Sequence, residues 1–116
     1  MPFWSAMLIY KILLPEEWEA FEASGQFDGS PFDKESGFVH CSTRTQVAAT
    51  ALRFFKDEPT LVVLAVDADM LGEMVRTEPA SSGEMFPHVY GAIPRNAVVE
   101  VYRAAGADEF VPPLRS

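Results

Sequence analysis

The sequence predicts a single small α+β domain, in which a curved or split sheet of five to six short strands carries flanking helices. Apolar runs of strand length are interrupted irregularly by two helix-like segments, so the regular alternation of a doubly wound parallel sheet is absent. The length of 116 residues, 48% of them hydrophobic, fits one domain with one core. We place this core at about residues 7–103 and a peripheral tail at residues 104–116.

The chain opens with a predicted strand followed by a predicted helix. Residues 8–14 form a short apolar run, which indicates a buried strand. The Pro-Glu-Glu sequence at 15–17 suits a first helical turn, because proline fits the N1 position and acidic side chains favour the positive end of the helix dipole. Trp18 and Phe21 would form the buried side of this helix, and Gly25 would end it.

A loop, a second strand and a second helix are expected next. Residues 26–36 are rich in glycine, proline, aspartate and serine and predict a loop, whereas residues 37–41 predict a strand. A helix should begin at residue 42 or 43, because residues 43–46 match the Thr-x-x-Gln pattern of a capping box, and it should end before Pro59. Its apolar face would consist of Val47, Ala51, Phe54 and Phe55.

The second half of the chain is mainly strand. The predicted segments are a buried strand at 61–66, a turn or short helix at 67–72, strands at 75–78 and 86–90 around a loop tip at 79–83, a turn at 94–96 and a last strand at 97–102. Pro87 has no backbone N–H to donate, so the strand at 86–90 is predicted at a sheet edge.

Charge, cysteine content and the N-terminus exclude several classes of protein. Nine basic against 17 acidic residues give a net charge of −8, which disfavours binding to bulk nucleic acid or to an anionic membrane surface. The single cysteine excludes a scaffold held by intrachain disulfides. The apolar stretch at residues 1–14 is too short to span a bilayer and no basic region precedes it, so we expect a cytoplasmic protein.

His40 is the first candidate for chemistry. In a strand, Phe38, His40 and Ser42 share one face, so His40 and Ser42 are expected to point together into a cleft. The helix start expected beside Ser42 and Thr43 would direct backbone N–H groups at an anion. The alternative is a core histidine that is hydrogen-bonded to a backbone carbonyl.

Cys41 lies on the opposite face of that strand and is expected to pack in the core. A thiol near a helix start can have a lowered pKa and act as a nucleophile, which keeps a cysteine-dependent hydrolase open as a third hypothesis. His88 is the only other histidine, and it shares a strand face with Tyr90. These two side chains would stack on a base or ribose or bond to it, and the alternative is an aromatic edge strand that covers the core.

Three charged residues complete the candidate set. Lys11 is the only charge in the first strand and needs either a partner or a cleft, unless it snorkels to the surface. Arg76 would bind a carboxylate or phosphate through the forked N–H donors of its guanidinium group, or else lie on a solvated strand face. Glu78 would orient one of these cations or bond to a hydroxyl. No H-x-x-x-H or C-x-x-C spacing is present, so no metal site is predicted.

The same segments carry a resemblance to a known family. The chain resembles the bacterial domain of unknown function 952 family from about residue 7 to residue 102. The signature segments are Ile9-Tyr10-Lys11-Ile12, Gly37-Phe38-Val39-His40-Cys41-Ser42-Thr43, Arg76-Thr77-Glu78 and Phe86-Pro87-His88-Val89-Tyr90-Gly91.

More distantly, the layout is similar to the ADP-ribosyltransferase-like fold, especially to tRNA 2′-phosphotransferases. This resemblance rests on residues 8–11, 38–42 and 62–68. It implies that His40 matches the second motif histidine, and that Lys11 stands where the first motif histidine would hold the nicotinamide-side ribose.

Together, these features predict an enzyme or degenerate enzyme that binds a small anionic, nucleotide-type ligand, namely NAD, ADP-ribose or a phosphorylated ribose, with NAD as the candidate cofactor. The expected catalytic residues are His40 and His88. The expected ligand-binding residues are Lys11, Ser42, Thr43, Arg76, Glu78 and Tyr90. The alternative function is a non-catalytic module that binds a small ligand or another protein.

Overall fold

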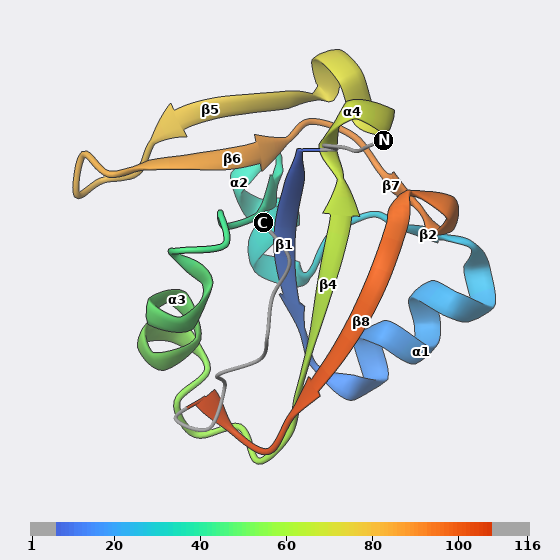
Figure 1. Cartoon of the computed structure of the whole chain (residues 1–116), viewed down its shortest axis with the longest axis vertical. Coiled ribbons are helices and arrows are strands. Elements are labelled where there is room, and N and C mark those ends of the chain that lie inside the picture. The colour runs from blue at the N-terminus through green and yellow to red at the C-terminus, as the bar shows by residue number, and fades with distance from the viewer. Residues whose placement is uncertain (1–6, 108–116) are drawn as a thin grey trace.

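The computed structural model describes residues 7–107, whose strands form three small antiparallel sheets (Figure 1). The first sheet has the order β1 (Leu8–Leu13), β4 (Leu61–Asp67) and β8 (Val98–Ala104). The second has the order β3 (Val39–His40), β6 (Met85–Val89) and β5 (Val75–Pro79). The third pairs β2 (Gln26–Phe27) with β7 (Ile93–Pro94).

The helices of this region are short. The α-helices are α1 (Pro15–Ser24), α2 (Pro31–Ser36), α3 (Val47–Phe54) and α4 (Ala68–Leu71), and Gly72–Met74 and Arg95–Ala97 form 3₁₀ turns. The predicted α+β class with several short strands is therefore confirmed. No helix within residues 7–107 is both long enough and apolar enough to cross a membrane.

One pair of residues links the two larger sheets. Tyr10 in β1 and Ser42, two residues after β3, exchange both backbone N–H···O hydrogen bonds at 2.8 Å. No second bridge continues this pairing among the described residues, so β1 and β3 separate beyond it. The β5–β6 hairpin consequently crosses the upper end of β1 instead of extending the first sheet (Figure 1). This divergence creates the space that the candidate site occupies.

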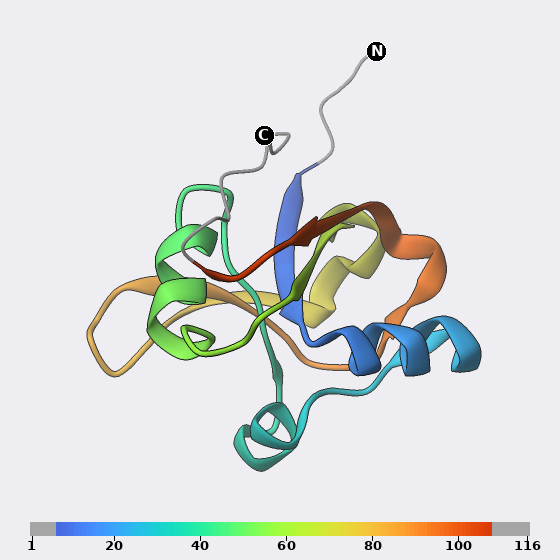
Figure 2. The same ribbon diagram turned by 90° about the horizontal axis from the view of Figure 1, so that it is seen from below.

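The first sheet has helices packed against both of its faces (Figure 2). Alternation along β1 assigns its side chains to these two faces. Ile9 and Leu13 join Trp18 and Phe21 of α1 in one apolar cluster. Tyr10 and Ile12 join Val47 and Ala51 of α3 in a second one. Strand β4 lies between β1 and β8 and is buried from Leu61 to Val66, which explains its uninterrupted apolar sequence.

The prediction for α1 is confirmed. Pro15 is its first residue, and the backbone N–H of Leu14 donates to Glu17 Oε1 at 2.9 Å. Trp18 and Phe21 are buried, and Gly25 ends the helix in the left-handed conformation at φ 87°.

Helix α3 begins at Val47 rather than at residue 42 or 43. Half of the predicted capping box is present, since the Thr43 N–H donates to Gln46 Oε1 at 3.0 Å. The Gln46 amide nitrogen, however, donates to Met85 O at 2.7 Å, and Gln46 becomes the N-cap of a helix of eight residues. Phe54, expected on the buried face, is 61% exposed.

The predicted loop at residues 26–36 is wrong in part, because it contains strand β2 and helix α2. Ser30 and Asp33 cap α2 reciprocally: the Asp33 N–H donates to Ser30 Oγ at 3.3 Å and the Ser30 N–H donates to Asp33 Oδ2 at 2.9 Å. Pro31 occupies the first turn. The residue types that suggested a loop are those that begin a short helix.

The prediction that residues 86–90 form an edge strand is also wrong, because β6 is the central strand of its sheet. The Pro87 carbonyl accepts from the Cys41 N–H at 3.1 Å, so the polar groups of Pro87 face the side of β3. Strand β3 has already ended there, at His40. The missing N–H therefore interrupts no hydrogen bond between β5 and β6.

The remaining second-half predictions are confirmed within a residue or two. Asp67, the last residue of β4, caps α4, with its Oδ1 accepting from the Asp69 N–H at 2.9 Å. Strand β8 continues to Ala104, the first residue of the predicted tail, and Ala107 is buried in the second apolar cluster. Residues 108–116 of that tail lie outside the described part of the chain.

Candidate functional site

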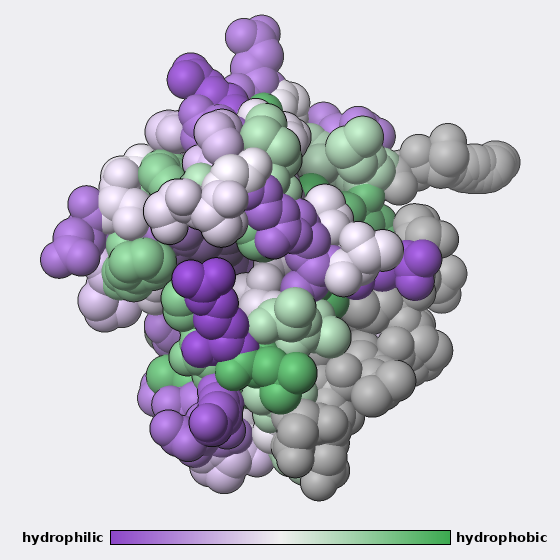
Figure 3. All heavy atoms as spheres, turned by 90° about the vertical axis from the view of Figure 1, so that its left-hand side faces the viewer, coloured by the Kyte–Doolittle hydropathy of each residue, from purple (hydrophilic) through white to green (hydrophobic). Residues whose placement is uncertain are grey.

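A cavity of about 790 Å³ lies where β1 and β3 separate. Strand β1 and the segment after β3 form its floor, α2 and α3 stand on opposite sides, and the β5–β6 hairpin closes it above. Six aromatic side chains line it: Tyr10, Phe32, Phe38, Phe54, Phe55 and Phe86. Seen from the side of α3 and the hairpin, hydrophobic and hydrophilic residues are interleaved over this face of the molecule (Figure 3).

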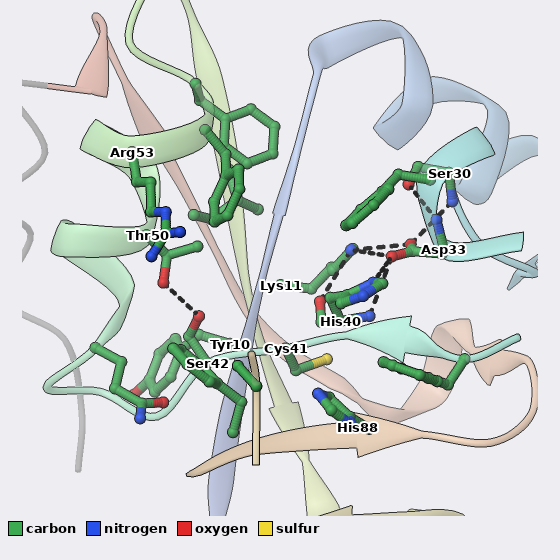
Figure 4. A pocket seen from close by; sticks show the side chains of 18 of the residues that line it. Tyr10, Lys11, Ser30, Asp33, His40, Cys41, Ser42, Thr50, Arg53 and His88 are labelled. Atoms are coloured by element: carbon green, nitrogen blue, oxygen red, sulfur yellow. Dashed lines mark hydrogen bonds and ion pairs between the residues drawn. The ribbon is translucent and has the colours of Figure 1, made fainter. Parts of the chain in front are cut away.

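On the α2 side, Asp33 is the centre of a buried polar cluster (Figure 4). Its Oδ1 lies 2.7 Å from His40 Nδ1 and accepts from the His40 N–H at 3.1 Å. Its Oδ2 lies 2.9 Å from Lys11 Nζ, which also donates to His40 O at 2.9 Å. The Lys11 side chain is 8% exposed and that of Asp33 only 2%, so the ion pair is shielded from water.

The electrostatics of this cluster keep Asp33 ionised. Burial alone would raise the pKa of the Asp33 carboxyl, but the hydrogen bond from His40 and the charge of Lys11 together outweigh it and hold the pKa well below its usual value. Because a carboxylate only accepts, His40 Nδ1 is the donor to Asp33, and Nε2 is the ring nitrogen that is left for a ligand.

On the hairpin side, Glu78 holds the second histidine in the same manner. Glu78 Oε1 lies 2.7 Å from His88 Nδ1 and accepts from the Tyr90 hydroxyl at 2.6 Å. Hydrogen bonds from Tyr90 and then His88 lower the pKa of Glu78, and the same bond raises the pKa of Tyr90. Arg76 places its guanidinium 4.8 Å from the centre of the Tyr90 ring.

The two carboxylate–histidine pairs converge around Phe38. The centres of the His40 and His88 rings are 5.7 Å apart, and the Phe38 ring lies 4.6 Å from His40 and 4.0 Å from His88. Phe32 also stacks on His40, with the ring centres 4.6 Å apart. Two imidazoles that are held by carboxylates in this manner can act as a general acid and a general base.

On the α3 side, the cavity contains hydroxyl groups and one further cation. The Ser42 hydroxyl, which is 3% exposed as a residue, donates to Thr50 Oγ1 at 3.1 Å. Arg53 follows one turn later and lies over the Phe54 ring at 5.2 Å. Glu17 and Glu84 also line the cavity.

Cys41 has the properties of a core residue. It is 4% exposed, and burial raises the pKa of its thiol to about 12. A thiol in that state is not ionised near neutral pH and is a poor nucleophile, which argues against the cysteine-dependent hydrolase.

The structure brings only some of the predicted site residues together. Lys11, His40, Ser42 and His88 line the cavity, whereas Glu78 bonds to His88 and Tyr90 bonds to Glu78. Arg76 and Thr43 do not line it. Thr43 is exposed and four residues from the first residue of α3, so the expected helix start beside Ser42 and Thr43 is absent.

Sequence reasoning missed Asp33, Thr50 and Arg53. The signal for Asp33 was the Ser-Pro-x-Asp sequence at 30–33, which is a capping box with proline at N1. Thr50 and Arg53 are three residues apart on one helix face, but no sequence pattern shows that this face meets a cavity.

Comparison with known proteins places the chain in a family. The model of the family described as "Protein of unknown function (DUF952)" matches residues 12–101. The crystal structure of protein CC0527 from Caulobacter crescentus is similar at 40% sequence identity and a TM-score of 0.79, covering 85% of this chain and 90% of that one.

The solution NMR structure of the same Caulobacter protein gives 39% identity and a TM-score of 0.78, over 89% of this chain and 90% of that one. No protein with a curated description matches the chain. The family match covers most of the sequence and includes all four residues of the two carboxylate–histidine pairs. The chain therefore belongs to the DUF952 family.

Proposed function

We propose that this protein is an enzyme that carries out acid–base chemistry on a small nucleotide-type ligand in the cavity, with His40 and His88 as the groups that exchange protons. One observation carries the proposal. The two imidazoles are each bound through Nδ1 to a carboxylate and lie 5.7 Å apart at the wall of one cavity. Paired groups of this kind accept a proton from one substrate atom and deliver one to another.

The aromatic lining supports a ligand with a planar ring. A cavity of about 790 Å³ that is lined by six aromatic side chains together with polar and charged groups has the size and character of a small-molecule site. A nucleobase or a nicotinamide ring would stack on such walls. The resemblance to ADP-ribosyltransferase-like proteins makes NAD and ADP-ribose the first compounds to test, and a cytoplasmic location fits such ligands.

In this function Lys11 acts as a positioning residue, because its contacts leave it little capacity to bind phosphate. Its ammonium group contacts both carboxylate oxygens of Asp33, at 3.2 and 2.9 Å, and His40 O at 2.9 Å. Lys11 thus fixes Asp33, and Asp33 in turn fixes the orientation of the His40 ring. Glu78 has the corresponding effect on His88.

The test is a screen for turnover of NAD, ADP-ribose and nucleoside 2′-phosphates by the purified protein, followed by mass spectrometry of the products. For any compound converted, His40→Asn and His88→Asn are each expected to lower kcat by roughly 10²- to 10⁴-fold, since each removes one proton-transfer group. Arg44→Gln changes an exposed residue outside the cavity and serves as the matched control. Conversion that survives in both histidine variants would overturn the proposal.

A specific observation favours the alternative, a module that binds the ligand without converting it. The His88 side chain is only 8% exposed, and the Phe38 ring covers it at 4.0 Å. The alternative predicts saturable binding of a compound from the same set with no product, and unchanged affinity in His88→Asn.

A further inference from the structure

We infer that Arg53 and Thr50 form an anion subsite that takes a single carboxylate or phosphate group of the ligand. The inference rests on the proposed function for the rest of the ligand, but the subsite itself is argued from the α3 side of the cavity. This pair of residues differs from Lys11 and Arg76, the two cations indicated by the sequence.

The cavity is lined by two cations, Lys11 and Arg53. Lys11 is neutralised by Asp33, as its contacts of 2.9 and 3.2 Å to the carboxylate show. No carboxylate within residues 7–107 forms an ion pair with Arg53, whose guanidinium is held only over the Phe54 ring. Arg53 is therefore the cavity cation whose donors remain available to a ligand.

Thr50 is the hydrogen-bond donor that accompanies Arg53 on α3. Thr50 and Arg53 are three residues apart on α3, so their side chains lie on the same face of the helix. Thr50 Oγ1 accepts the hydrogen bond of the buried Ser42 hydroxyl at 3.1 Å, which leaves the Thr50 hydroxyl hydrogen to donate. Figure 4 shows Thr50 and Arg53 on the opposite side of β1 from Lys11, Asp33 and His40.

Two acidic side chains of the cavity limit the negative charge that the ligand can carry. Glu17 and Glu84 line the same cavity, and their carboxylates accept from the Leu14 N–H at 2.9 Å and from the Gln46 amide at 3.1 Å. These two negative charges oppose the one positive charge of Arg53. A single anionic group satisfies Arg53, whereas a triphosphate would bring uncompensated negative charge into a cavity that both glutamates line.

The test uses inorganic phosphate and acetate as separate probes, so that it does not depend on a nucleotide. Titration of ¹⁵N-labelled protein is followed by NMR at the Arg53 side chain and the backbone amides of α3. Saturable shifts are expected there with at least one probe, and they are expected to disappear in Arg53→Gln and to persist in Arg44→Gln, an exposed residue outside the cavity. The probe that saturates identifies the preferred anionic group. Absence of saturation with both probes, or equal saturation in Arg53→Gln, overturns the subsite whatever the histidine variants show.

A second arm compares ribonucleosides with their monophosphates and triphosphates by calorimetry. The monophosphate is expected to bind roughly 10- to 100-fold more tightly than the nucleoside, because it adds charge-assisted hydrogen bonds. Arg53→Gln should remove that difference and leave nucleoside affinity unchanged. Equal affinity of nucleoside and monophosphate, or tighter binding of the triphosphate than of the monophosphate, would contradict the inference. Lack of binding by every nucleoside compound, with saturation by the simple anions, would leave the subsite standing and count against the proposed function.

Discussion

Lys11 and Asp33 form an ion pair inside the protein, with Nζ 2.9 Å from Oδ2 and both side chains shielded from water. The pair joins β1 to α2 across 22 residues of sequence and orients His40 through the Oδ1 atom of Asp33. The charged residue of this otherwise apolar strand is therefore part of the scaffold of the candidate site.

Loss of Lys11 is expected to destabilise the protein strongly. Lys11→Met would leave the Asp33 carboxylate buried without a cation, which costs about 3–5 kcal/mol in comparable cases. Urea denaturation measures the change in the free energy of unfolding. Lys34→Met, at an exposed residue of α2, is the control and should cost at most about 0.5 kcal/mol. Equal losses in the two variants would show that the ion pair contributes nothing.

Acid should weaken the fold through Asp33. Its pKa is lowered in the folded protein, so the unfolded chain binds the proton more readily. The stability that Asp33 contributes is fully present above the ordinary pKa of 3.8 and is lost as the pH falls below that value. Urea denaturation at a series of pH values should show a shallower acid loss in Asp33→Asn than in wild type. Asp57→Asn, at an exposed residue, should follow the wild-type curve.

The Cys41 thiol should resist alkylation in the folded protein. Burial raises its pKa to about 12 from the ordinary 9.0, which leaves about a thousandfold less thiolate at any pH below both values. Mass spectrometry after iodoacetamide treatment measures the labelling rate, and the urea-unfolded chain provides the fast reference. Rapid labelling of the native protein would return the cysteine-dependent hydrolase to consideration.

Tyr90 should ionise more readily once Glu78 is neutralised. The hydrogen bond to Glu78 raises the pKa of Tyr90 above 10.0, and burial adds to this effect. In Glu78→Gln the Tyr90 pKa is expected to fall toward its ordinary value. The ultraviolet absorbance of tyrosinate measures the titration, and Tyr90→Phe identifies which part of the signal belongs to this residue. An unchanged Tyr90 titration would show that the 2.6 Å contact is absent in solution.

Gln46 should hold the β5–β6 hairpin against α3. Its amide nitrogen donates to Met85 O at 2.7 Å and to Glu84 Oε2 at 3.1 Å. Gln46→Ala is expected to speed hydrogen exchange at the Gly83 N–H, which bonds to Ala80 O in the hairpin tip, and to lower global stability by only about 1 kcal/mol. Glu84→Gln retains the bond to Met85 and should have the smaller effect. Unchanged exchange at Gly83 in Gln46→Ala would refute the role of Gln46.

Local sequence patterns were sufficient for the elements that form the two apolar clusters. The apolar runs of β1 and β4, the Pro-Glu-Glu start of α1 and the spacing of Val47 and Ala51 on α3 each encode burial within a few residues. Both histidines were also candidates from the sequence, because strand alternation assigns each of them to a face that it shares with another polar residue. These features depend on periodicity, which a single segment contains in full.

Only the tertiary structure decided how the site is assembled. The partner of Lys11, the central position of the strand that contains Pro87, and the approach of His40 to His88 all join segments that are distant along the chain. The sequence by itself determined the α+β class, the buried strands and the two candidate histidines. Contacts between remote segments depend on which faces pack together after the sheets separate at Tyr10 and Ser42. No local sequence pattern encodes these contacts.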